Sequence, residues 1–379
     1  MRRVRNLAIF GIIAFAVLGG AAWLFRAQVL PSLLGVNFDA GPGGEAQLDV
    51  PDGYRASVFA EGLSRPRFMA VSPDGVLFVA EPGADRVVAL PDEDGDGRAD
   101  EIVEVGTEFD GAHDVAFDAD GRLLVAGQTT LFRLTLEGLA EADRTVLVDG
   151  IPTGGHSTRT VIELPSGDLL LSIGSSCNVC EEEDARRASV QLVSGGELRP
   201  YMIGLRNAVG LWLDPETERA WATDMGRDGL GDDLPPETIY ELVDGADAGW
   251  PRCHDGTLHD PDFGGAADAC GDVATPAATF PPHTAPLALV GWDDHLFVAL
   301  HGSWNSSVKV GYAVWWMPWD GEPAGAPEPF ATGFLPEGGG DALGRPAGLA
   351  VGGDRALYIS DDKAGFIYRV TGPETTPGG

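Results

Sequence analysis

Short apolar runs separated by tight polar turns recur along most of the chain. One unit, an apolar strand, a polar turn and a second apolar strand, is found at residues 65–81, 111–127, 155–174, 205–224, 282–302 and 345–362. Its turns at Asp74-Gly75, Asp120-Gly121 and Ser166-Gly167 are 46 residues apart, and Asp and Gly suit such turns because they tolerate positive φ or bond their own backbone. A period of about 40–50 residues with several strands per repeat is typical of propeller blades. The sequence therefore predicts an all-β, six-bladed β-propeller over residues 51–371, followed by a flexible tail over residues 372–379.

Polar side chains stand at the start of several of these repeats, where propeller loops gather at one end of the central channel. Blade symmetry makes the following side chains converge there: His156 in the third repeat, Arg206 and Asn207 in the fourth, His283 and Thr284 in the fifth, and Arg345 in the sixth. A histidine with an ordinary pKa near 6.5 is suited to take a proton near neutral pH, so His156 is a candidate base. A lone histidine is also a common structural residue, and that alternative stays open.

Two arginines that point into one channel mouth favour an anionic ligand, because guanidinium forks match carboxylates. The alternative is that Arg206 and Arg345 each brace a neighbouring blade through an acidic partner. At the end of a strand in the fifth repeat, His301-Gly302-Ser303-Trp304-Asn305 offers rings that can stack on a flat ligand, with Gly302 allowing close approach. A surface loop with a packed tryptophan explains the same string.

Two stretches are rich in oxygen ligands for a hard cation. Carboxylates at Asp92, Asp94, Asp96 and Asp100 fall at positions 1, 3, 5 and 9 of a calcium-type loop with glycine at position 6, but position 12 is Val103 instead of glutamate. This predicts either a peripheral calcium site or an unmetallated acidic hairpin. The main-chain carbonyls of Gly226 and Arg227 follow the strand of the fourth repeat and can hold a cation near the channel.

The first 50 residues differ from the repeats. Arg2, Arg3 and Arg5 precede an uncharged apolar run over residues 7–25, which is close to the length of about 20 residues that spans a bilayer as a helix. The basic flank places the body outside the cytoplasmic membrane. We interpret residues 1–25 as an uncleaved transmembrane anchor and residues 26–50 as a tether, with a cleaved signal peptide and an exported body as the alternative.

Four cysteines fit an exported chain, because an oxidising compartment favours disulfides. Three pairings are open, and the local one joins Cys177 to Cys180 and Cys253 to Cys270. A zinc site that uses a neighbouring histidine, His254 or His259, is the alternative.

The formal net charge of −33 argues against nucleic-acid binding, which needs a basic face. The same charge disfavours docking on anionic lipid, so membrane contact is expected through the N-terminal helix alone. The acidic excess is explained either by a solvated acidic shell or by adaptation to high salt.

Taken together, these motifs resemble the soluble pyrroloquinoline-quinone (PQQ) dependent sugar dehydrogenases, the glucose/sorbosone dehydrogenase family, and within it the sorbosone-dehydrogenase-like branch. The likeness covers roughly residues 50–371. The segments that carry it are residues 53–81, Gly155-His156-Ser157, Arg206 to Leu211, residues 237–251, His301 to Asn305, Arg345 to Leu349 and Ser360 to Asp362. The Cys177-Asn178-Val179-Cys180 string points to the sorbosone-like branch.

The resemblance implies a quinone across the channel mouth, with oxidation of an aldose or related aldehyde or alcohol and delivery of electrons to a respiratory acceptor. His156 matches the family's base, and Arg206 matches the arginine beside the reacting carbonyl. Gly226 and Arg227 match the carbonyls that hold the catalytic Ca²⁺. The remaining cofactor contacts would be Asn207, His283, Thr284, His301, Trp304 and Arg345. The chain departs from the family by lacking a clear equivalent of its cofactor-binding lysine, and by having Arg227 after the glycine.

Two other functions compete with this one. A six-bladed metal-dependent lactonase or esterase needs several Glu, Asp and Asn side chains around a central metal, whereas the repeat starts here offer His and Arg. A non-enzymatic extracellular binding propeller is equally compatible with the fold, because fold does not imply function.

Overall fold

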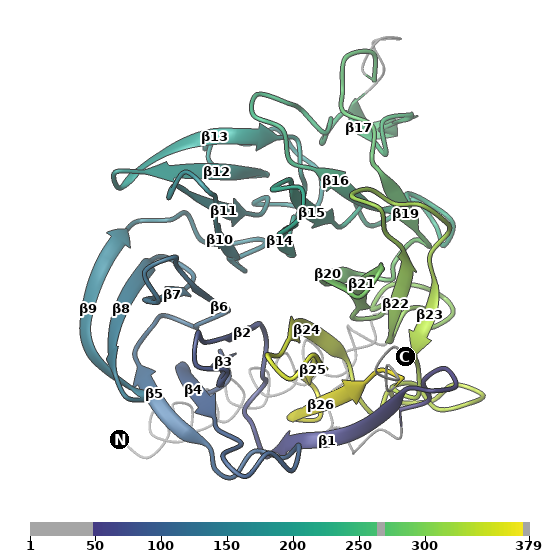
Figure 1. The fold of residues 1–379 in the computed structure, drawn as a ribbon. Helices are drawn as coiled ribbons and strands as arrows, with labels where there is room; N and C mark the ends of the chain where they lie inside the picture. The colour runs from purple at the N-terminus through teal and green to yellow at the C-terminus, as the bar shows by residue number, and fades with distance from the viewer. Residues whose placement is uncertain (1–47, 264–269, 374–379) are drawn as a thin grey trace, which may run out of the picture.

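The computed structural model describes residues 48–263 and 270–373, and within them it shows six four-stranded antiparallel sheets arranged around a central channel (Figure 1). The six-bladed all-β prediction is confirmed. The only helical element in the described residues is a short 3-10 turn, η2 (Pro261–Phe263).

Each of the first three blades is a meander of four consecutive strands, numbered outward from the channel. Blade 1 contains β2 (Met69–Val71), β3 (Leu77–Glu81), β4 (Arg86–Leu90) and β5 (Val103–Thr107). Blade 2 contains β6 (Asp114–Phe117), β7 (Leu123–Ala126), β8 (Leu131–Glu137) and β9 (Ala140–Val148). Blade 3 contains β10 (Val161–Glu163), β11 (Leu169–Ile173), β12 (Ser189–Ser194) and β13 (Glu197–Ile203).

The last three blades follow the same plan, except that blade 4 contains an insertion and blade 6 takes its outermost strand from the N-terminal end of the repeat region. Blade 4 contains β14 (Leu211–Leu213), β15 (Ala220–Asp224), β16 (Glu237–Glu241) and, after the insertion, β19 (Ala278–Phe280). Blade 5 contains β20 (Pro286–Trp292), β21 (His295–Leu300), β22 (Ala313–Pro318) and β23 (Glu328–Ala331). Blade 6 contains β24 (Pro346–Val351), β25 (Leu357–Asp361), β26 (Phe366–Thr371) and β1 (Arg55–Glu61).

The ring is closed in blade 6, which combines strands from both ends of the repeat region. The N-terminal strand β1 pairs antiparallel with the C-terminal strand β26, from Arg55 opposite Thr371 to Glu61 opposite Phe366. The two ends of the repeat region therefore share one sheet (Figure 1). Opening the ring at this point therefore requires the backbone hydrogen bonds between β1 and β26 to break.

The hydrophobic core lies between neighbouring blades. Strands in the middle of a blade are covered on both faces, so β3 and β25 are buried at every residue instead of alternating. The largest core cluster joins blades 5 and 6, where Phe297 and Phe330 pack edge to face and Leu349 and Ile359 complete the contact. This continuous packing fixes the loops at the channel end on a rigid base.

Both predicted local disulfides are present, Cys177–Cys180 and Cys253–Cys270. The zinc alternative is therefore wrong, because none of the four cysteines is a free thiol. The second disulfide ties the insertion in blade 4, which carries the hairpin β17 (Cys253–His254) and β18 (Leu258–His259).

The N-terminal apolar run lies outside the described residues, as does the tail over 374–379. Within the described ranges, no helix is long and apolar enough to cross a membrane. Asp49 and Thr332 exchange two backbone hydrogen bonds of 3.0 Å, and Leu48 and Val50 pack on the core of blades 5 and 6. The propeller body thus includes residues 48–50, which the sequence assigned to the tether.

Candidate functional site

One end of the channel collects polar residues from all six blades. The innermost strand of a blade runs antiparallel to the second, so the start of one strand lies beside the end of the next, as Asp114 lies beside Ala126 and Pro346 beside Asp361. Side chains just before the first strand and just after the second therefore meet at this mouth. This arrangement brings together His156 and Arg206, which are 50 residues apart in sequence.

His156 has one ring nitrogen in a hydrogen bond and one with no partner in the part of the chain that the structure describes. Its Nδ1 lies 2.9 Å from Ser175 Oγ, and its backbone N–H donates to Ser175 O at 2.9 Å. Its Nε2 makes no hydrogen bond to any described residue. Burial lowers the pKa of His156 to about 4, and the charges of Arg206 and Arg187 act in the same direction. The imidazole is therefore neutral at physiological pH and able to accept a proton.

Arg206 is held rigidly beside it. The guanidinium is nearly buried and donates from Nε to Asn178 O at 2.9 Å and from Nη2 to Asn178 Oδ1 at 2.9 Å and to Asp228 Oδ2 at 3.0 Å. Burial lowers the pKa of Arg206, while Asp228 opposes this effect. The bracing alternative raised from the sequence is thus partly correct, since Arg206 does have an acidic partner. Arg206 also lies close enough to His156 for its charge to lower the pKa of the imidazole.

Two further buried carboxyl groups support this part of the mouth. Asp224 accepts hydrogen bonds from the backbone N–H groups of Arg206 and Asn207, at 3.2 and 2.7 Å. Glu237 accepts from Gly226 N at 2.7 Å. Burial raises the pKa of Asp224 to about 7 and that of Glu237 to about 8. Both carboxyls fix the backbone of the residues that the sequence singled out.

Asn207 and His156 both lie against Gly174. A Cβ at Gly174 would be 2.6 Å from His156 Cβ and 2.7 Å from Asn207 Oδ1, so only glycine fits between them. Asn207 Oδ1 is buried and has no hydrogen-bond partner within the described structure. Leaving a buried acceptor without a hydrogen bond lowers stability by about 1–3 kcal/mol. This oxygen is therefore a candidate to accept a hydrogen bond from a bound ligand.

The opposite side of the mouth is an ion-pair network. Arg67 Nη1 contacts Asp362 Oδ2 at 2.5 Å, Asp362 Oδ1 lies 2.9 Å from His301 Nε2, and Arg67 Nη2 lies 3.2 Å from His113 Nε2. Burial alone would raise the pKa of Asp362, but His301 and Arg67 hold it well below its usual range. Burial lowers the pKa of His301 to about 4, although Asp362 opposes this shift. The network links blades 1, 2, 5 and 6.

Arg345 joins the same side. Its guanidinium donates to the carbonyls of His301 and Gly302, at 3.0 and 2.7 Å, and lies 5.2 Å from the centre of the Tyr312 ring. Arg345 therefore braces blade 6 against blade 5 through these carbonyl groups.

The remaining residues predicted to contact the cofactor differ in whether their side chains are exposed or already hydrogen-bonded within the protein. Thr284 is 1% exposed and donates its hydroxyl to Pro281 O at 2.8 Å, while His283 Nε2 lies 2.8 Å from Gly231 O. Both side chains are used within the protein. Trp304 is 43% exposed and remains available for stacking. The ring that covers Gly302 is the chain's own Tyr312, which a Cβ at this glycine would meet at 2.5 Å, so packing explains the glycine without a flat ligand.

The two predicted cation sites remain predictions. The Arg227 side chain turns away to Asp260 and Asp262, at 2.6 and 2.8 Å, so its charge is neutralised there and its carbonyl stays a candidate ligand with that of Gly226. In the β4–β5 loop, the carboxylates of Asp92, Asp94 and Asp100 lie within 4.8 Å of one another. Asp92 and Asp94 accept from Asp96 N, and Asp96 accepts from Arg98 N, which is the hydrogen bonding of an acidic turn.

A hollow of about 280 Å³ opens between the starts of blades 1, 2 and 3, at Ser157 and Thr158, the two residues that follow His156. Its polar lining is Arg65, Arg67, His113, Gln128, Ser157 and Thr158. Sequence reasoning missed Arg67 and His113, although each precedes the first strand of its repeat as His156 does. Aligning the six repeat starts would have found both. Ser175 and Asn178 carried no comparable signal, because their roles depend on the path of a turn.

Comparison with known proteins agrees with this architecture. The TrAA12-like family model matches residues 48–238 and 258–373, and the Glucose / Sorbosone dehydrogenase model matches residues 192–311. A PQQ-dependent pyranose dehydrogenase of Coprinopsis cinerea is 26% identical over 424 aligned positions, which cover 90% of this chain and 57% of that protein. The chain thus spans little more than half the length of this relative.

Solved structures show the same fold. The PQQ domain of the Coprinopsis cinerea pyranose dehydrogenase, in its holo form, superposes with a TM-score of 0.76 at 23% identity, covering 88% of this chain and 98% of that one. The calcium structure of the Trichoderma reesei family AA12 protein gives 0.73 at 20% identity, covering 89% and 99%. The PQQ-bound aldose sugar dehydrogenase of Streptomyces coelicolor gives 0.62 at 18% identity, covering 87% and 100%. The resemblance found in the motifs is confirmed: the chain is a six-bladed propeller that belongs to the TrAA12-like family.

Proposed function

We propose that this chain is a PQQ-dependent dehydrogenase that oxidises an aldose sugar or a related aldehyde or alcohol, with a sorbosone-like compound within that range. Membership of the TrAA12-like family and the likeness to a pyranose dehydrogenase support the reaction class. The observation that carries the proposal is a neutral imidazole at the channel mouth, His156, whose Nε2 has no partner among the described residues and whose neighbour is the cation Arg206.

The residues at the mouth fit a planar tricarboxylate such as PQQ. Arg65 lines the hollow at Ser157 and Thr158, the residues that follow His156, and guanidinium groups match carboxylates in charge and geometry. The unpaired Asn207 Oδ1 offers an acceptor. We assign the cofactor contacts to Asn207, Arg345 and Trp304. A catalytic Ca²⁺ would be held by the carbonyls of Gly226 and Arg227, in line with the preference of this ion for oxygen ligands.

When bound, the quinone supplies the acceptor for the two electrons that leave the substrate as hydride, with Ca²⁺ polarising it. The protein supplies the proton transfer. His156 Nε2 takes the proton of the substrate hydroxyl as the C–H bond breaks, so the C–O bond becomes a carbonyl and the imidazole becomes imidazolium. A positioned base of this kind contributes about 10²–10⁴-fold to the rate.

Arg206 holds positive charge beside the reacting groups and stabilises negative charge that develops there. It cannot swing away, because Asn178 and Asp228 accept its hydrogen bonds on two sides. Its charge also disfavours a protonated His156 in the resting protein, which keeps the base ready. Arg206 therefore already has its orientation, and His156 its neutral charge state, in the protein without substrate.

We further propose that the body acts outside the cytoplasmic membrane, anchored by residues 1–25, and passes electrons to a respiratory acceptor. Two disulfides support an oxidising compartment. The basic N-terminal flank supports the orientation.

The test uses the full-length chain with PQQ and Ca²⁺ added together or singly, a dye as electron acceptor and a panel of aldoses, ketoses and sugar aldehydes. Dye reduction that requires substrate and PQQ supports the proposal, and a further requirement for Ca²⁺ supports the metal assignment. Absence of both PQQ binding and dye reduction across the panel would contradict it. Hydrolysis of a lactone without PQQ would favour the lactonase alternative.

A further inference from the structure

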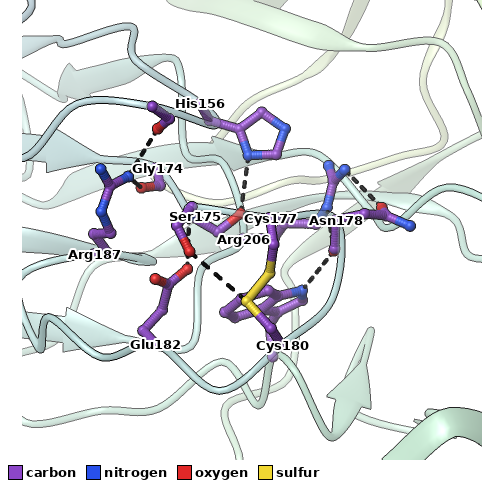
Figure 2. Close-up of a disulfide and its surroundings, with 12 residues drawn as sticks. His156, Gly174, Ser175, Cys177, Asn178, Cys180, Glu182, Arg187 and Arg206 are labelled. Atoms are coloured by element: carbon purple, nitrogen blue, oxygen red, sulfur yellow. Dashed lines mark hydrogen bonds between the residues drawn. A yellow bond between two sulfur atoms is a disulfide. The ribbon is translucent and has the colours of Figure 1, made fainter.

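The turn that follows β11 contacts both proposed catalytic residues. Cys177 and Cys180 are joined by a disulfide, and the turn they close lies under His156 and Arg206 (Figure 2). Gly155 packs directly on the start of this turn, since a Cβ there would overlap the carbonyl oxygens of Ser175 and Ser176. Neighbouring loops therefore hold the turn against the base.

The hydrogen bonds of Ser175 determine which nitrogen of His156 carries the proton. Ser175 Oγ lies 2.6 Å from the carbonyl oxygen of Cys177 and 2.9 Å from His156 Nδ1. A carbonyl can only accept, so the single hydroxyl proton of Ser175 points to Cys177 O. Ser175 Oγ then accepts from His156, which requires the proton on Nδ1 and leaves the lone pair on Nε2.

The next residue of the turn fixes the arginine. The Asn178 side chain and carbonyl accept three hydrogen bonds from Arg206 and Trp250: Nε to O at 2.9 Å, Nη2 to Oδ1 at 2.9 Å, and Trp250 Nε1 to O at 3.3 Å. Asn178 also exchanges hydrogen bonds with Asp228, at 2.8 and 2.9 Å. Adjacent carbonyls of one closed turn thus serve the base and the cation.

We propose that the disulfide-closed turn 175–180 is a positioning device: Ser175 locks His156 in the Nδ1–H tautomer, and the closed ring holds the carbonyls of Cys177 and Asn178 where the base and Arg206 need them. Ser175 is a positioning residue, since it acts through His156. Its role in turnover rests on the proposed function. The tautomer itself is a property of the protein without cofactor and can be measured independently.

The direct test is ¹⁵N NMR of the full-length chain labelled at histidine, without PQQ or metal, at pH 7. The His156 signals are assigned by their loss in His156→Gln. We expect a protonated Nδ1 and an unprotonated Nε2 in the wild type. Finding the proton on Nε2 would overturn the proposal whatever the activity of the enzyme, and this measurement needs no variant of the turn.

Variants of the turn sharpen the test. Ser175→Ala should shift His156 toward the Nε2–H tautomer and lower kcat about 10–100-fold with little change in KM, as is typical when a supporting hydrogen bond is removed. Ser175→Thr keeps a hydroxyl and should restore the Nδ1–H signal. The control is Ser176→Ala, whose hydroxyl lies near Cys180 Sγ at 3.7 Å and does not contact His156. A wild-type tautomer in Ser175→Ala would contradict the role of the serine.

The disulfide is tested by comparing Cys177→Ser/Cys180→Ser with Cys253→Ser/Cys270→Ser. Opening the first should lower kcat and mix the His156 tautomers, whereas opening the second should change neither. Unchanged NMR signals and kcat in the first double variant would overturn the role of the ring closure. If the wild type shows the Nδ1–H tautomer but no PQQ-dependent activity, the positioning stands and the proposed function fails.

Discussion

Two partly buried histidines at the same channel mouth, His156 and His301, differ in what their ring nitrogens contact. His156 is bonded through Nδ1 to a neutral hydroxyl, and its Nε2 has no partner among the described residues. His301 is bonded through Nε2 to Asp362, which is also paired with Arg67. Burial lowers the pKa of both histidines to about 4. A similar pKa therefore accompanies two different roles.

The difference separates a reactive side of the mouth from a bracing side. In blades 3 and 4, hydrogen bonds orient His156 and Arg206 while leaving an imidazole lone pair available. In blades 1, 2, 5 and 6, Arg67, His113, His301 and Asp362 contact one another, and Arg345 donates to carbonyl groups. Chemistry is expected on the first side and stability from the second, and each prediction below tests that division.

The largest effect is expected from His156→Gln. Loss of the base should lower kcat about 10²–10⁴-fold. The melting temperature should stay near that of the wild type, because only the contact with Ser175 is lost. The matched variant His301→Ala should show the reverse pattern, with a lower melting temperature and a much smaller change in kcat. Equal losses of activity in steady-state assays of the two purified variants would contradict the division of the mouth into a reactive side and a bracing side.

Arg206→Ala should lower kcat about 10²–10³-fold, the range seen when a donor to developing negative charge is removed. It should also raise the pKa of His156, because a cation that disfavours imidazolium is gone. NMR titration of the histidine measures this shift without any cofactor. An unchanged or lower pKa would contradict the electrostatic contact between the two residues.

Asp362→Asn should lower the free energy of unfolding by up to about 3–5 kcal/mol, because it leaves Arg67, whose side chain is only 11% exposed, without its carboxylate. Denaturant unfolding measures the loss, and kcat per folded molecule should remain close to the wild-type value. A loss of kcat as large as that of His156→Gln, with wild-type stability, would place the reaction on the bracing side.

The pH profile follows from the lowered pKa of His156. The base works when neutral, so kcat/KM should be flat from pH 8 to pH 5 and should fall below about pH 4. Because the folded pKa lies below the ordinary value near 6.5, the neutral imidazoles of His156 and His301 contribute stability that is present above pH 6.5 and is lost as pH falls through about 4. An acid limb in kcat/KM near pH 6.5 would contradict a base with a lowered pKa.

The smallest effect is expected from Arg199→Ala. Arg199 and Asp244 form an ion pair in which both side chains are about half exposed, so water screens the interaction. The free energy of unfolding should change very little, and kcat should not change. A larger loss would show that exposed charges matter more to this acidic chain than the buried network does.

The fold was predictable because each blade is local in sequence. Apolar strands and tight polar turns recur at 46-residue intervals over the first three repeats and at longer intervals after them, and four-stranded meanders follow from this pattern. The same repeats placed His156 and Arg206 at one mouth. Ring closure was harder to predict, because β1 reads as an ordinary strand and its partner β26 begins more than 300 residues later.

The bracing network escaped prediction for the same reason. Arg67 and Asp362 meet only because blade 1 lies next to blade 6 once the ring is closed. Thr284 was predicted as a cofactor contact from its place in the repeat, yet a local hydrogen bond to Pro281 O already uses its hydroxyl. Sequence position locates a residue at the mouth, whereas its available atoms depend on contacts that only the packed structure supplies.

The central claim is that His156 removes a substrate proton during oxidation by bound quinone. Stopped-flow absorbance can follow reduction of PQQ by sugar in a single turnover, with the wild type and His156→Gln loaded with equal amounts of PQQ and Ca²⁺. The account predicts rapid reduction in the wild type and reduction at least about 10²-fold slower in the variant, with PQQ binding retained. Equal reduction rates in the two loaded proteins would contradict it.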